Sequence, residues 1–466
     1  MTSSIQKLED LRLEQPIHLC GIGGSAMNGL ATLLTQKGFR VRGTDPSIDG
    51  ATRTRLEMAG IDVFTTQDGS TITNNTQLVV TTAALPPTHP ELTAAQEKGI
   101  PVIKYAAMLG VVMNSFTGIA VAGTHGKTST SALTVAALRG AGLDPGFVIG
   151  GYIEQFGAGA HGGNTYLVAE ACEYDRSFYN LHPKIAVITN IEADHLDIYA
   201  DLNDIIDSFA HFVENLPNDG KLIYCAESPA AKKLASRFSG HSVSYGFTDA
   251  MFTATNIQNQ NNQLIFQVTH NNTELATISL RLPGHHNVLN ALASFVAGLQ
   301  LGISAKALAR GISEFSGVNR RFEQIGIARD ITVIDDYAHH PTEIRAMLQG
   351  ARQRFTTARI VVAFQPHQIS RTKFFFTEFA AAFKLADHVL LPDIYIARDI
   401  ERPADINSKN LAVKIQEAGT DATYTESFEN TTATALWLLQ PGDVFITVGA
   451  GNIYDVAHRV LSALQK

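Results

Sequence analysis

The stretch AVAGTHGKTSTSALT, residues 120–134, sets a glycine-rich turn between a buried-strand pattern and a helical pattern. The preceding run FTGIAVAG has the pattern of a buried strand, and the following run TSTSALTVAALRGAG repeats its apolar residues at helical spacing. In such a loop, backbone N–H groups at the helix start surround phosphate oxygens, a lysine reaches the terminal phosphates and a hydroxyl holds magnesium. The pattern therefore predicts a nucleotide site in an α/β domain.

This loop is shorter than the standard phosphate-binding loop, because Val121 stands where the standard loop has its first glycine. The alternative is a glycine turn with a solvated lysine. The combination of strand, glycines, Gly-Lys-Thr and helix favours the nucleotide site, since such motifs gain specificity from their context. The residues expected to contact ATP here are Gly123, Thr124, His125, Gly126, Lys127, Thr128 and Ser129.

Composition narrows the class of protein. A chain of 466 residues is expected to form about three domains, and 17% charged with 45% hydrophobic residues is typical of a globular protein. The net charge of -8 argues against a nucleic-acid-binding surface, and three distant cysteines suggest neither a disulfide framework nor a zinc site. The polar N-terminus and the lack of an 18-residue apolar run predict a cytoplasmic chain without a membrane partner.

A second glycine turn opens the chain. In PIHLCGIGGSAMNGLATLLTQKGFRVRGTD an apolar strand is followed by a glycine turn, a helix, and a second strand that is expected to end on Asp45. The turn resembles a dinucleotide fingerprint, although Ala26 replaces its last glycine. Asp45 is placed to bond a ribose hydroxyl or to cap a helix, and tight strand-to-helix packing is the alternative. The candidate substrate-binding residues are Gly21, Gly23, Gly24, Ser25 and Asp45.

Alternating strand and helix patterns divide the chain into three sections, which we expect to be domains at residues 1–115, 116–317 and 318–466. Within the second, NIQNQNNQLIFQVTHNNTELATISLRLPG alternates apolar and polar residues around an Asn-Asn turn and predicts an antiparallel surface hairpin. The third contains four strand-like runs separated by helical stretches, which predicts a doubly wound sheet with ligands at the carboxyl ends of its strands.

Polar residues follow two predicted strands of the second section. One strand ends on Glu170 in YLVAEACEYDRSF, and another ends on Asn190 in IAVITNIEADHLDIY. Carboxylates beyond the carboxyl ends of parallel strands would suit a magnesium ion that accompanies ATP, and ordinary acidic loops are the alternative. The polar residues that follow these strands are Glu173, Asp175, Glu192, Asp194, His195 and Asp197.

Several motifs together resemble the Mur ligases. They occur in the order and approximate spacing of that family and cover almost the whole chain: GTHGKT, EACEYDRSF, TNIEADHLDIY, PGHHNVLNALAS, GVNRRFE, DDYAHHPTE, FQPHQISRT and VGAGNIYDV. The resemblance is strongest to the branch that adds L-alanine, and the family's loop also lacks the early glycine. It implies an N-terminal Rossmann-like domain for the UDP moiety, a central P-loop ATPase-like domain with a mostly parallel sheet and a small antiparallel ribbon, and a C-terminal Rossmann-like domain.

The resemblance also implies a reaction and its participants. The lactyl carboxylate of UDP-N-acetylmuramate would attack the γ-phosphate of ATP, and L-alanine would attack the resulting acyl phosphate in a step of peptidoglycan biosynthesis. Magnesium, or manganese, would accompany ATP. The family's ligands match Thr128, Glu170 and His195, and its nucleotide contacts match Asn287, Asn290, Arg321 and Asp336. The residues matched to the muramoyl and amino-acid side are His339, His340, His367 and Arg371, and the implied catalytic set is Lys127, Glu170, His195, His339 and Arg371.

The sequence departs from the family pattern at two positions. Gln368 replaces an arginine, and Cys172 replaces an aspartate in the glutamate motif. A further family feature, a modified lysine beyond the metal histidine, is absent because Ala210 and His211 occupy that region, which agrees with the alanine branch. The alternatives are a ligase that recycles murein tripeptide, a ligase for glycine or serine, a UDP-sugar-binding protein without catalysis, and a dehydrogenase. The chain is expected to be a monomer or a homodimer.

Overall fold

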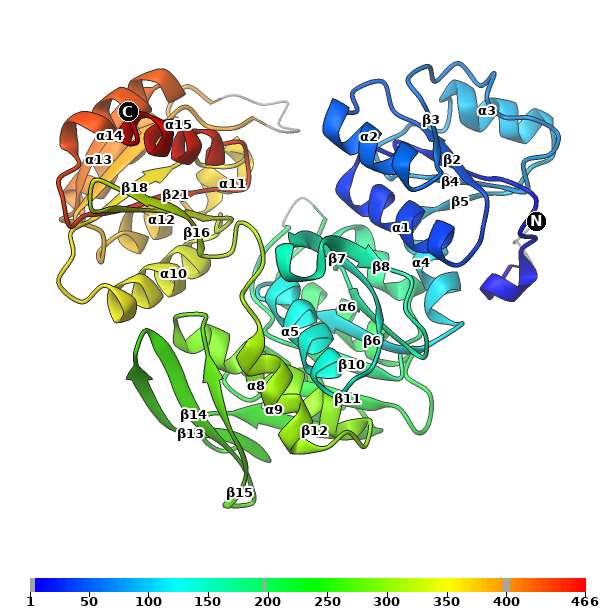
Figure 1. Ribbon diagram of the computed structural model, residues 1–466, viewed down its shortest axis with the longest axis horizontal. Coiled ribbons are helices and arrows are strands. Elements are labelled where there is room, and N and C mark those ends of the chain that lie inside the picture. The colour runs from blue at the N-terminus through cyan, green and yellow to red at the C-terminus, as the bar shows by residue number, and fades with distance from the viewer. Residues whose placement is uncertain (1–4, 196–197, 397–402) are drawn as a thin grey trace. The chain divides into compact units, whose positions relative to one another are not determined.

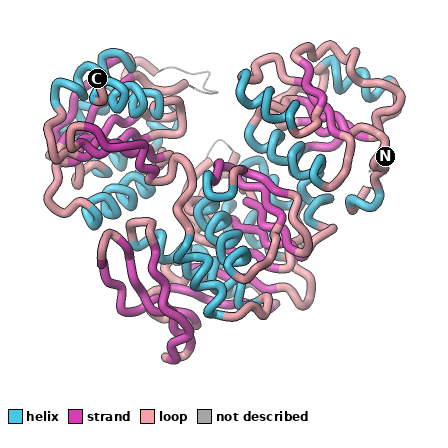
Figure 2. Tube along the Cα trace, in the orientation of Figure 1, coloured by secondary structure: helices cyan, strands magenta, loops and turns pink. Residues whose placement is uncertain are grey.

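A computed structural model describes residues 5–195, 198–396 and 403–466, and many of its helices and strands are labelled in Figure 1. The chain divides into two compact units. The first comprises residues 1–257, 266–279 and 289–315, and the second comprises residues 258–265, 280–288 and 316–466. Figure 2 shows that strands and helices alternate along most of the chain, as the sequence predicts for an α/β protein.

The N-terminal sheet is parallel and has the strand order β3-β2-β1-β4-β5, which is a doubly wound arrangement. Its central strand β1 is completely buried, so ligands can reach this sheet only at the strand ends. The strands are β1 Ile17–Cys20, β2 Val41–Thr44, β3 Asp62–Phe64, β4 Leu78–Thr81 and β5 Val102–Lys104. The helices are η1 Leu8–Asp10, α1 Ser25–Gln36, α2 Gly50–Met58, α3 Pro90–Glu97 and α4 Tyr105–Met113.

The central sheet has the order β15-β14-β13-β12-β11-β10-β6-β9-β7-β8. Strands β6, β9, β10, β11 and β12 run parallel, whereas β8 pairs antiparallel with β7. The strands are β6 Thr117–Ala122, β7 Gly146–Ile153, β8 Ala158–His161, β9 Tyr166–Glu170, β10 Ile185–Ile188, β11 Lys221–Cys225, β12 His241–Gly246, β13 Phe252–Gln260, β14 Gln263–His270 and β15 Thr273–Leu280. The helices are α5 Lys127–Gly140, η2 Glu154–Phe156, η3 Tyr174–Asn180, α6 Leu202–Val213, α7 Pro229–Arg237, α8 His285–Gln300 and α9 Ala305–Glu314.

The Asn-rich segment forms more than the single hairpin that its sequence predicts. Strands β13, β14 and β15 follow one another across two-residue turns, Asn261-Asn262 and Asn271-Asn272. All four asparagines have positive φ, between 49° and 64°. Two such residues in succession give the tight turn that suits a right-twisted antiparallel pair, and asparagine tolerates this conformation better than other non-glycine residues. The segment is therefore a three-stranded extension of the central sheet.

Helices α5 and α9 pack with their backbones in direct contact. A Cβ atom on Gly140 would lie 2.4 Å from the Cα of Gly311, and one on Gly311 would lie 2.2 Å from the carbonyl oxygen of Ala136. No side chain fits at either position, so glycine is required for the helices to approach this closely. The apolar stripe of α9, which includes the buried Leu308 and Ile312, completes the contact.

The C-terminal sheet has the order β16-β17-β21-β18-β19-β20, with β16 antiparallel to β17 and the other pairs parallel. Four of its strands coincide with the four predicted runs, and β16 and β20 are additional. The strands are β16 Glu323–Ala328, β17 Ile331–Asp336, β18 Ile360–Phe364, β19 His388–Pro392, β20 Asp421–Glu426 and β21 Val444–Val448. The helices are α10 Pro341–Arg354, α11 Ile369–Phe374, α12 Phe376–Ala382, α13 Ser408–Glu417, α14 Phe428–Leu438 and α15 Tyr454–Leu464.

The three sheets fall one in each predicted section, while the exact domain boundaries stay a prediction. Two strand ends differ from expectation: β2 ends at Thr44 rather than Asp45, and β10 ends at Ile188 rather than Asn190. In each case the next polar side chain bonds a neighbouring loop instead of continuing the ladder, as described below. Across the residues that the structure describes, no helix combines the length and apolar character needed to cross a membrane.

Candidate active site

The glycine loop lies between β6 and α5, where its sequence predicts it. Gly126 has φ 81° and precedes the first residue of α5, Lys127, so the loop reverses direction directly at the helix N-terminus. Backbone N–H groups at such a terminus attract anions through their unpaired hydrogens and the helix dipole. Thr128 and Ser129 follow in the first turn of the same helix.

Two residues at the end of β10 hold the loop in shape. Asn190 accepts a hydrogen bond from the backbone N–H of His125 at 2.8 Å and donates one to the His125 carbonyl at 3.1 Å. Thr189 donates to the same carbonyl at 2.6 Å. The Thr124 hydroxyl in turn accepts from the N–H of Glu192 at 2.8 Å. These bonds fix the loop before any ligand contributes. The sequence pattern places Asn190 at the end of a strand but does not indicate that its side chain bonds this loop.

The loop lysine is almost buried and is paired with a carboxylate. The ammonium Nζ of Lys127 lies 2.9 Å from Oε1 of Glu173 and also donates to the carbonyls of Gly123 at 2.5 Å and Thr124 at 3.2 Å. Burial opposes the charged form of Lys127, but Glu173 outweighs it and raises the pKa of the lysine. Burial likewise disfavours the carboxylate of Glu173, but Lys127 and then His195 lower its pKa.

Glu170, the last residue of β9, contacts two parts of the site. Its Oε2 accepts a hydrogen bond from the Thr128 hydroxyl at 3.1 Å, and its Oε1 accepts one from the N–H of Gly150 at 2.6 Å. A hydroxyl and a carboxylate oxygen side by side are the hard donors that magnesium prefers. Thr128 and Glu170 therefore offer oxygen donors that suit Mg²⁺, and their role as metal ligands stays a prediction.

His195 lies against carboxylates in a strained backbone position. Its φ is 54°, which is uncommon for a non-glycine residue, and its Nε2 lies 3.5 Å from Oε1 of Glu173 and 3.8 Å from Oδ2 of Asp194. Among the described residues, its ring pairs with Glu173 and Asp194, whereas the carboxylate of Glu170 bonds Thr128 and Gly150. Its role as a metal ligand stays a prediction, and Asp197, which follows it in the motif, lies outside the described residues.

The two asparagines predicted to line the adenine pocket both lie in α8. The Oδ1 of Asn290 accepts a hydrogen bond from the Thr130 hydroxyl of α5 at 3.1 Å, so Asn290 contacts the helix that carries the loop. Asn287 donates its Nδ2 to the carbonyl of Pro283 at 2.8 Å, which fixes the start of the helix. Both are buried. Burial lowers the pKa of the neighbouring His286 to about 4, although Glu343 acts in the opposite direction.

The N-terminal glycine turn is built around the end of β2. The Thr44 carbonyl accepts hydrogen bonds from the N–H groups of Gly21 at 2.7 Å and Ile22 at 3.0 Å. The carboxylate of Asp45 accepts from the N–H of Gly23 at 3.0 Å. The side chain of Asp45 thus bonds the backbone of the turn. Gly24 is the N-cap of α1, and Ser25 is the first residue of that helix. These residues meet at the carboxyl edge of the sheet, where Rossmann-like domains bind nucleotides.

In the C-terminal domain, Asp336 ends β17 and bonds two backbone N–H groups, those of Phe322 at 2.7 Å and Ala338 at 2.8 Å. Burial raises the pKa of Asp336 to about 6, opposed by the charge of Arg321. The guanidinium of Arg321 lies 4.9 Å from the ring centroid of Tyr337. Asp336 and Arg321 are therefore near each other, as their shared prediction requires.

The paired histidines begin α10. His340 is its N-cap, accepting from the N–H of Thr342 at 3.2 Å, and Glu343 completes a capping box. Nδ1 of His339 lies 3.3 Å from Oε2 of Glu343, and its ring lies 6.2 Å from that of His367. His340 therefore caps the helix that begins at Pro341. A contact between His340 and the substrate stays a prediction.

Models of three consecutive Mur ligase domains match this chain. The model "Mur ligase family, catalytic domain" matches residues 16–117, "Mur ligase middle domain" matches 121–298 and "Mur ligase, glutamate ligase domain" matches 320–451. The UDP-N-acetylmuramate–L-alanine ligase of Acetivibrio thermocellus is 40% identical over 454 residues, which cover 96% of each chain. The chain belongs to the Mur ligase family. The enzyme of the same name from Clostridium novyi is also 40% identical, over 96% of this chain and 97% of its own.

Solved Mur ligase structures agree with this assignment. The UDP-N-acetylmuramate-alanine ligase MurC of Thermotoga maritima is 28% identical, covers 97% of this chain and 99% of its own, and superposes with a TM-score of 0.82. A murein peptide ligase from Psychrobacter arcticus is also 28% identical with the same coverage, at a TM-score of 0.70. This Mur ligase therefore has the three-domain α/β fold of mostly parallel sheets that the motifs imply.

The two departures from the family pattern have distinct surroundings. Cys172 is exposed, two residues beyond the end of β9. Gln368 is the N-cap of α11 with φ 72° and ψ 133°, and its carbonyl accepts hydrogen bonds from the N–H and hydroxyl of Thr372. Arg371 lies in the same short helix. The backbone at Gln368 is thus fixed by the helix start, whatever side chain the position carries.

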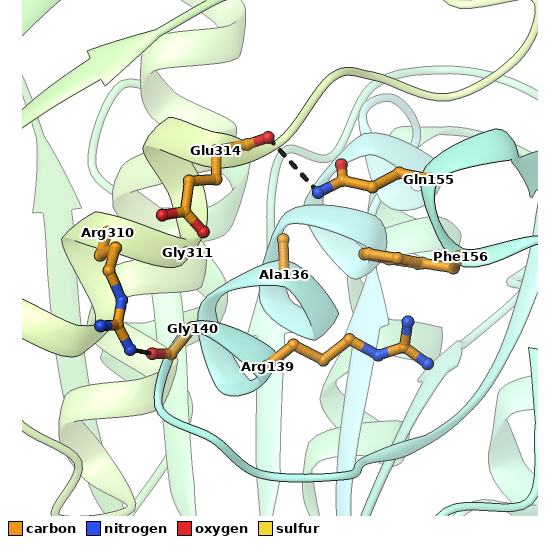
Figure 3. Close-up of a pocket in the computed structure, with 8 residues that line it drawn as sticks. All are labelled: Ala136, Arg139, Gly140, Gln155, Phe156, Arg310, Gly311 and Glu314. Atoms are coloured by element: carbon orange, nitrogen blue, oxygen red, sulfur yellow. Dashed lines mark hydrogen bonds between the residues drawn. The ribbon is translucent and has the colours of Figure 1, made fainter.

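A separate cavity of about 450 Å³ opens at the other end of α5 (Figure 3). The Arg139 guanidinium lies 4.4 Å from the ring centroid of Phe156, and Arg310 donates to the carbonyl of Gly140. The side chain of Gln155 donates to the carbonyl of Glu314 at 3.4 Å. None of the predicted site residues lines this cavity, so it is distinct from the candidate active site of this Mur ligase.

Proposed function

We propose that this Mur ligase joins L-alanine to the lactyl carboxylate of UDP-N-acetylmuramate and uses one ATP per bond. The relatives that match over nearly the whole chain bear that activity in their names. The observation that carries the proposal is the loop at the start of α5, where Lys127, Thr128 and Glu170 stand together at a helix N-terminus. A protein that only bound the sugar nucleotide would have no use for this arrangement.

The first step is transfer of a phosphoryl group. A lactyl carboxylate oxygen attacks the γ-phosphorus, the bond to the bridging oxygen of the β-phosphate breaks, and ADP leaves. Charge spread over the γ-phosphate oxygens is stabilised by donors and cations that are already in place. N–H groups at the start of α5 and the ammonium of Lys127 would supply these, whereas the N–H groups of Thr124 and His125 are already bonded to Asn190. The lysine must exchange its contact with Glu173 for one with phosphate.

Thr128 and Glu170 would hold Mg²⁺, or Mn²⁺, and His195 is the third proposed ligand. The ion would neutralise part of the phosphate charge. The Gly150 N–H bond engages one carboxylate oxygen of Glu170, so the oxygen beside Thr128 would be the one available to the metal. We infer that this bond orients the carboxylate.

The second step forms the amide. The amine of L-alanine attacks the acyl carbon, the tetrahedral intermediate collapses, and phosphate leaves with the electrons of its bond to that carbon. We propose that Arg371 recognises the carboxylate of the amino acid, because a guanidinium offers two parallel hydrogen bonds to a carboxylate. His339 and His367 are proposed to face the muramoyl and alanine side, and Arg321 and Asp336 the nucleotide.

The test is ADP release by the purified protein with ATP, magnesium and UDP-N-acetylmuramate. L-alanine, glycine, L-serine and the murein tripeptide are supplied in parallel, each against a blank without acceptor. Release that requires both the sugar nucleotide and L-alanine is expected, and Lys127→Met should lower it by about 10²-fold or more. Release with the tripeptide alone would instead assign the chain to murein recycling. We further propose a cytoplasmic monomer or homodimer, which light scattering after size exclusion would distinguish.

A further inference from the structure

A buried carboxylate lies beneath the N-terminal glycine turn. Glu91, in the first turn of α3, is completely inaccessible to solvent, as are His18 of β1 and Thr44 of β2. Oε1 of Glu91 lies 2.8 Å from Nε2 of His18 and 2.9 Å from the Thr44 hydroxyl, whose distance to Oε2 is 2.8 Å. The Thr71 hydroxyl is a more distant partner at 3.4 Å. One carboxylate thus joins α3 to two adjacent strands.

The carboxylate is held in its charged form. Burial alone would raise the pKa of Glu91, but the hydrogen bond and charge of His18, followed by the Thr44 hydroxyl, lower it below the usual range. A charged group in this position requires its partners, because an unpaired buried charge is costly. The side chain of Thr44 is consequently held by a hydrogen bond to this carboxylate that is shielded from solvent.

Thr44 transmits this constraint to the turn. Its carbonyl accepts from the N–H groups of both Gly21 and Ile22, and Gln67 donates to its hydroxyl at 3.1 Å. The next residue, Asp45, accepts from Gly23. Three consecutive N–H groups of the turn are therefore bonded to a two-residue segment that Glu91 anchors.

We propose that Glu91, acting through Thr44, is a positioning residue for the sugar nucleotide: it sets the conformation of the glycine turn that receives the UDP moiety. The proposal rests on the proposed function, because it takes this turn as the UDP site. Glu91 has no exposed atom and does not touch the substrate itself. Its removal leaves the ATP loop unaltered, because that loop is built on the central sheet.

The inference predicts a selective effect on one substrate. Glu91→Gln keeps the size of the side chain and removes its charge, and Thr44→Val removes the hydroxyl with little change of shape. Each should raise the KM for UDP-N-acetylmuramate roughly tenfold, as expected for a lost hydrogen bond to a charged group, and leave the KM for ATP unchanged. Thr44→Ser keeps the hydroxyl and should restore the wild-type KM.

A matched control lies elsewhere in the same domain. Thr76 is also buried, and its hydroxyl accepts from Arg42 and from the N–H of Thr73, but it precedes β4 and so lies toward the amino end of that strand. Thr76→Val therefore removes a buried, hydrogen-bonded hydroxyl without touching the turn. It should lower thermal stability and leave the KM for UDP-N-acetylmuramate at the wild-type value.

The experiment is calorimetric titration of UDP-N-acetylmuramate into each folded variant, with magnesium and a non-hydrolysable ATP analogue present. Weaker binding in Glu91→Gln and Thr44→Val, with wild-type binding in Thr44→Ser and Thr76→Val, is the expected result. If the wild-type protein fails to bind the sugar nucleotide, the proposed function is wrong. If the wild type binds and Thr44→Val binds equally well, the function stands and the positioning role of Glu91 is refuted, whether or not Glu91→Gln folds.

Discussion

Lys127 and Glu173 form a nearly solvent-free ion pair, with 2.9 Å between Nζ and Oε1 and side-chain exposures of 17% and 4%. The lysine that we propose binds the phosphates of ATP is thus paired with a carboxylate of the protein. His195 approaches the same carboxylate oxygen at 3.5 Å. Glu173 therefore contacts both Lys127, the proposed phosphate-binding residue, and His195, the proposed metal ligand.

Replacement of Glu173 by glutamine should destabilise the protein by about 3 kcal/mol, because it leaves a buried ammonium without its counter-charge. ATP should recover part of this loss, since its phosphates supply the missing negative charge. The gain in the free energy of unfolding on adding ATP and magnesium should therefore be larger in Glu173→Gln than in the wild type. Unfolding in urea with and without ATP measures both quantities.

The control for this variant is an exposed pair with nearly the same distance. Arg53 and Glu57 lie 2.8 Å apart on α2, each about 45% exposed. Glu57→Gln should change the free energy of unfolding by less than about 0.5 kcal/mol, because exposed pairs contribute little. An equal loss in the two variants would contradict the view that burial gives the Lys127–Glu173 pair its energy.

His286 should make stability depend on pH. Burial lowers its folded-state pKa to about 4, below the ordinary value of 6.5. Between these two values the unfolded chain binds more protons than the folded one, so the contribution of His286 to stability rises with pH and is lost as pH falls. His286→Gln should therefore gain stability relative to the wild type when pH is lowered from about 7 to about 4. A difference between the two proteins that is constant across this range would show that His286 does not titrate there.

Cys172 should react slowly with thiol reagents despite its exposure. The protein packed around the thiol and the charge of Glu173 raise its pKa to about 11, so little thiolate is present at neutral pH. Iodoacetamide labelling followed by mass spectrometry should give a rate that keeps rising beyond pH 9. Because Lys127 lowers this pKa, Lys127→Met should slow the reaction further. Rapid labelling at pH 7 would contradict the raised pKa of Cys172.

Gln368 should be more stable as glycine. A φ of 72° with ψ of 133° is unfavourable for a residue with a side chain. Gln368→Gly should therefore raise the free energy of unfolding by about 1 kcal/mol, after allowing for the greater freedom of glycine in the unfolded chain. Gln368→Arg, which has the same backbone requirement, serves as the control and should leave stability unchanged. Denaturant titration of the two variants decides the matter.

The sequence predicts those parts of the site in which function depends on local spacing. The loop before α5, the Thr128 hydroxyl and Glu170 at the end of β9 are fixed by position along strand, turn and helix, and the structure has them together. The sequence offers Glu173 only as one of several carboxylates that would suit magnesium. It does not predict the pairing of Glu173 with Lys127 or the bonds of Asn190 to the loop, because several polar residues follow each strand and only the folded backbone decides which one turns toward the loop.

The fold shows the same division. The long apolar runs identify the buried strands but do not predict β16 and β20, because edge strands such as Asp421–Glu426 carry polar residues and lack a continuous apolar pattern. The alternating pattern predicts one Asn-Asn turn, whereas the structure has a second at residues 271–272 with the same two positive-φ asparagines as the first.

The contact of Gly140 with Gly311 implies a particular pattern of tolerance to mutation. Even alanine at either position would force α5 away from α9, and α5 carries the phosphate loop at its other end. In a comprehensive mutational survey these two glycines should rank with Lys127 in sensitivity, although neither touches a reacting atom. Both glycines should then be as strictly conserved among homologues as the residues that take part in the reaction. An alignment of sequences alone would therefore not distinguish these two glycines from catalytic residues.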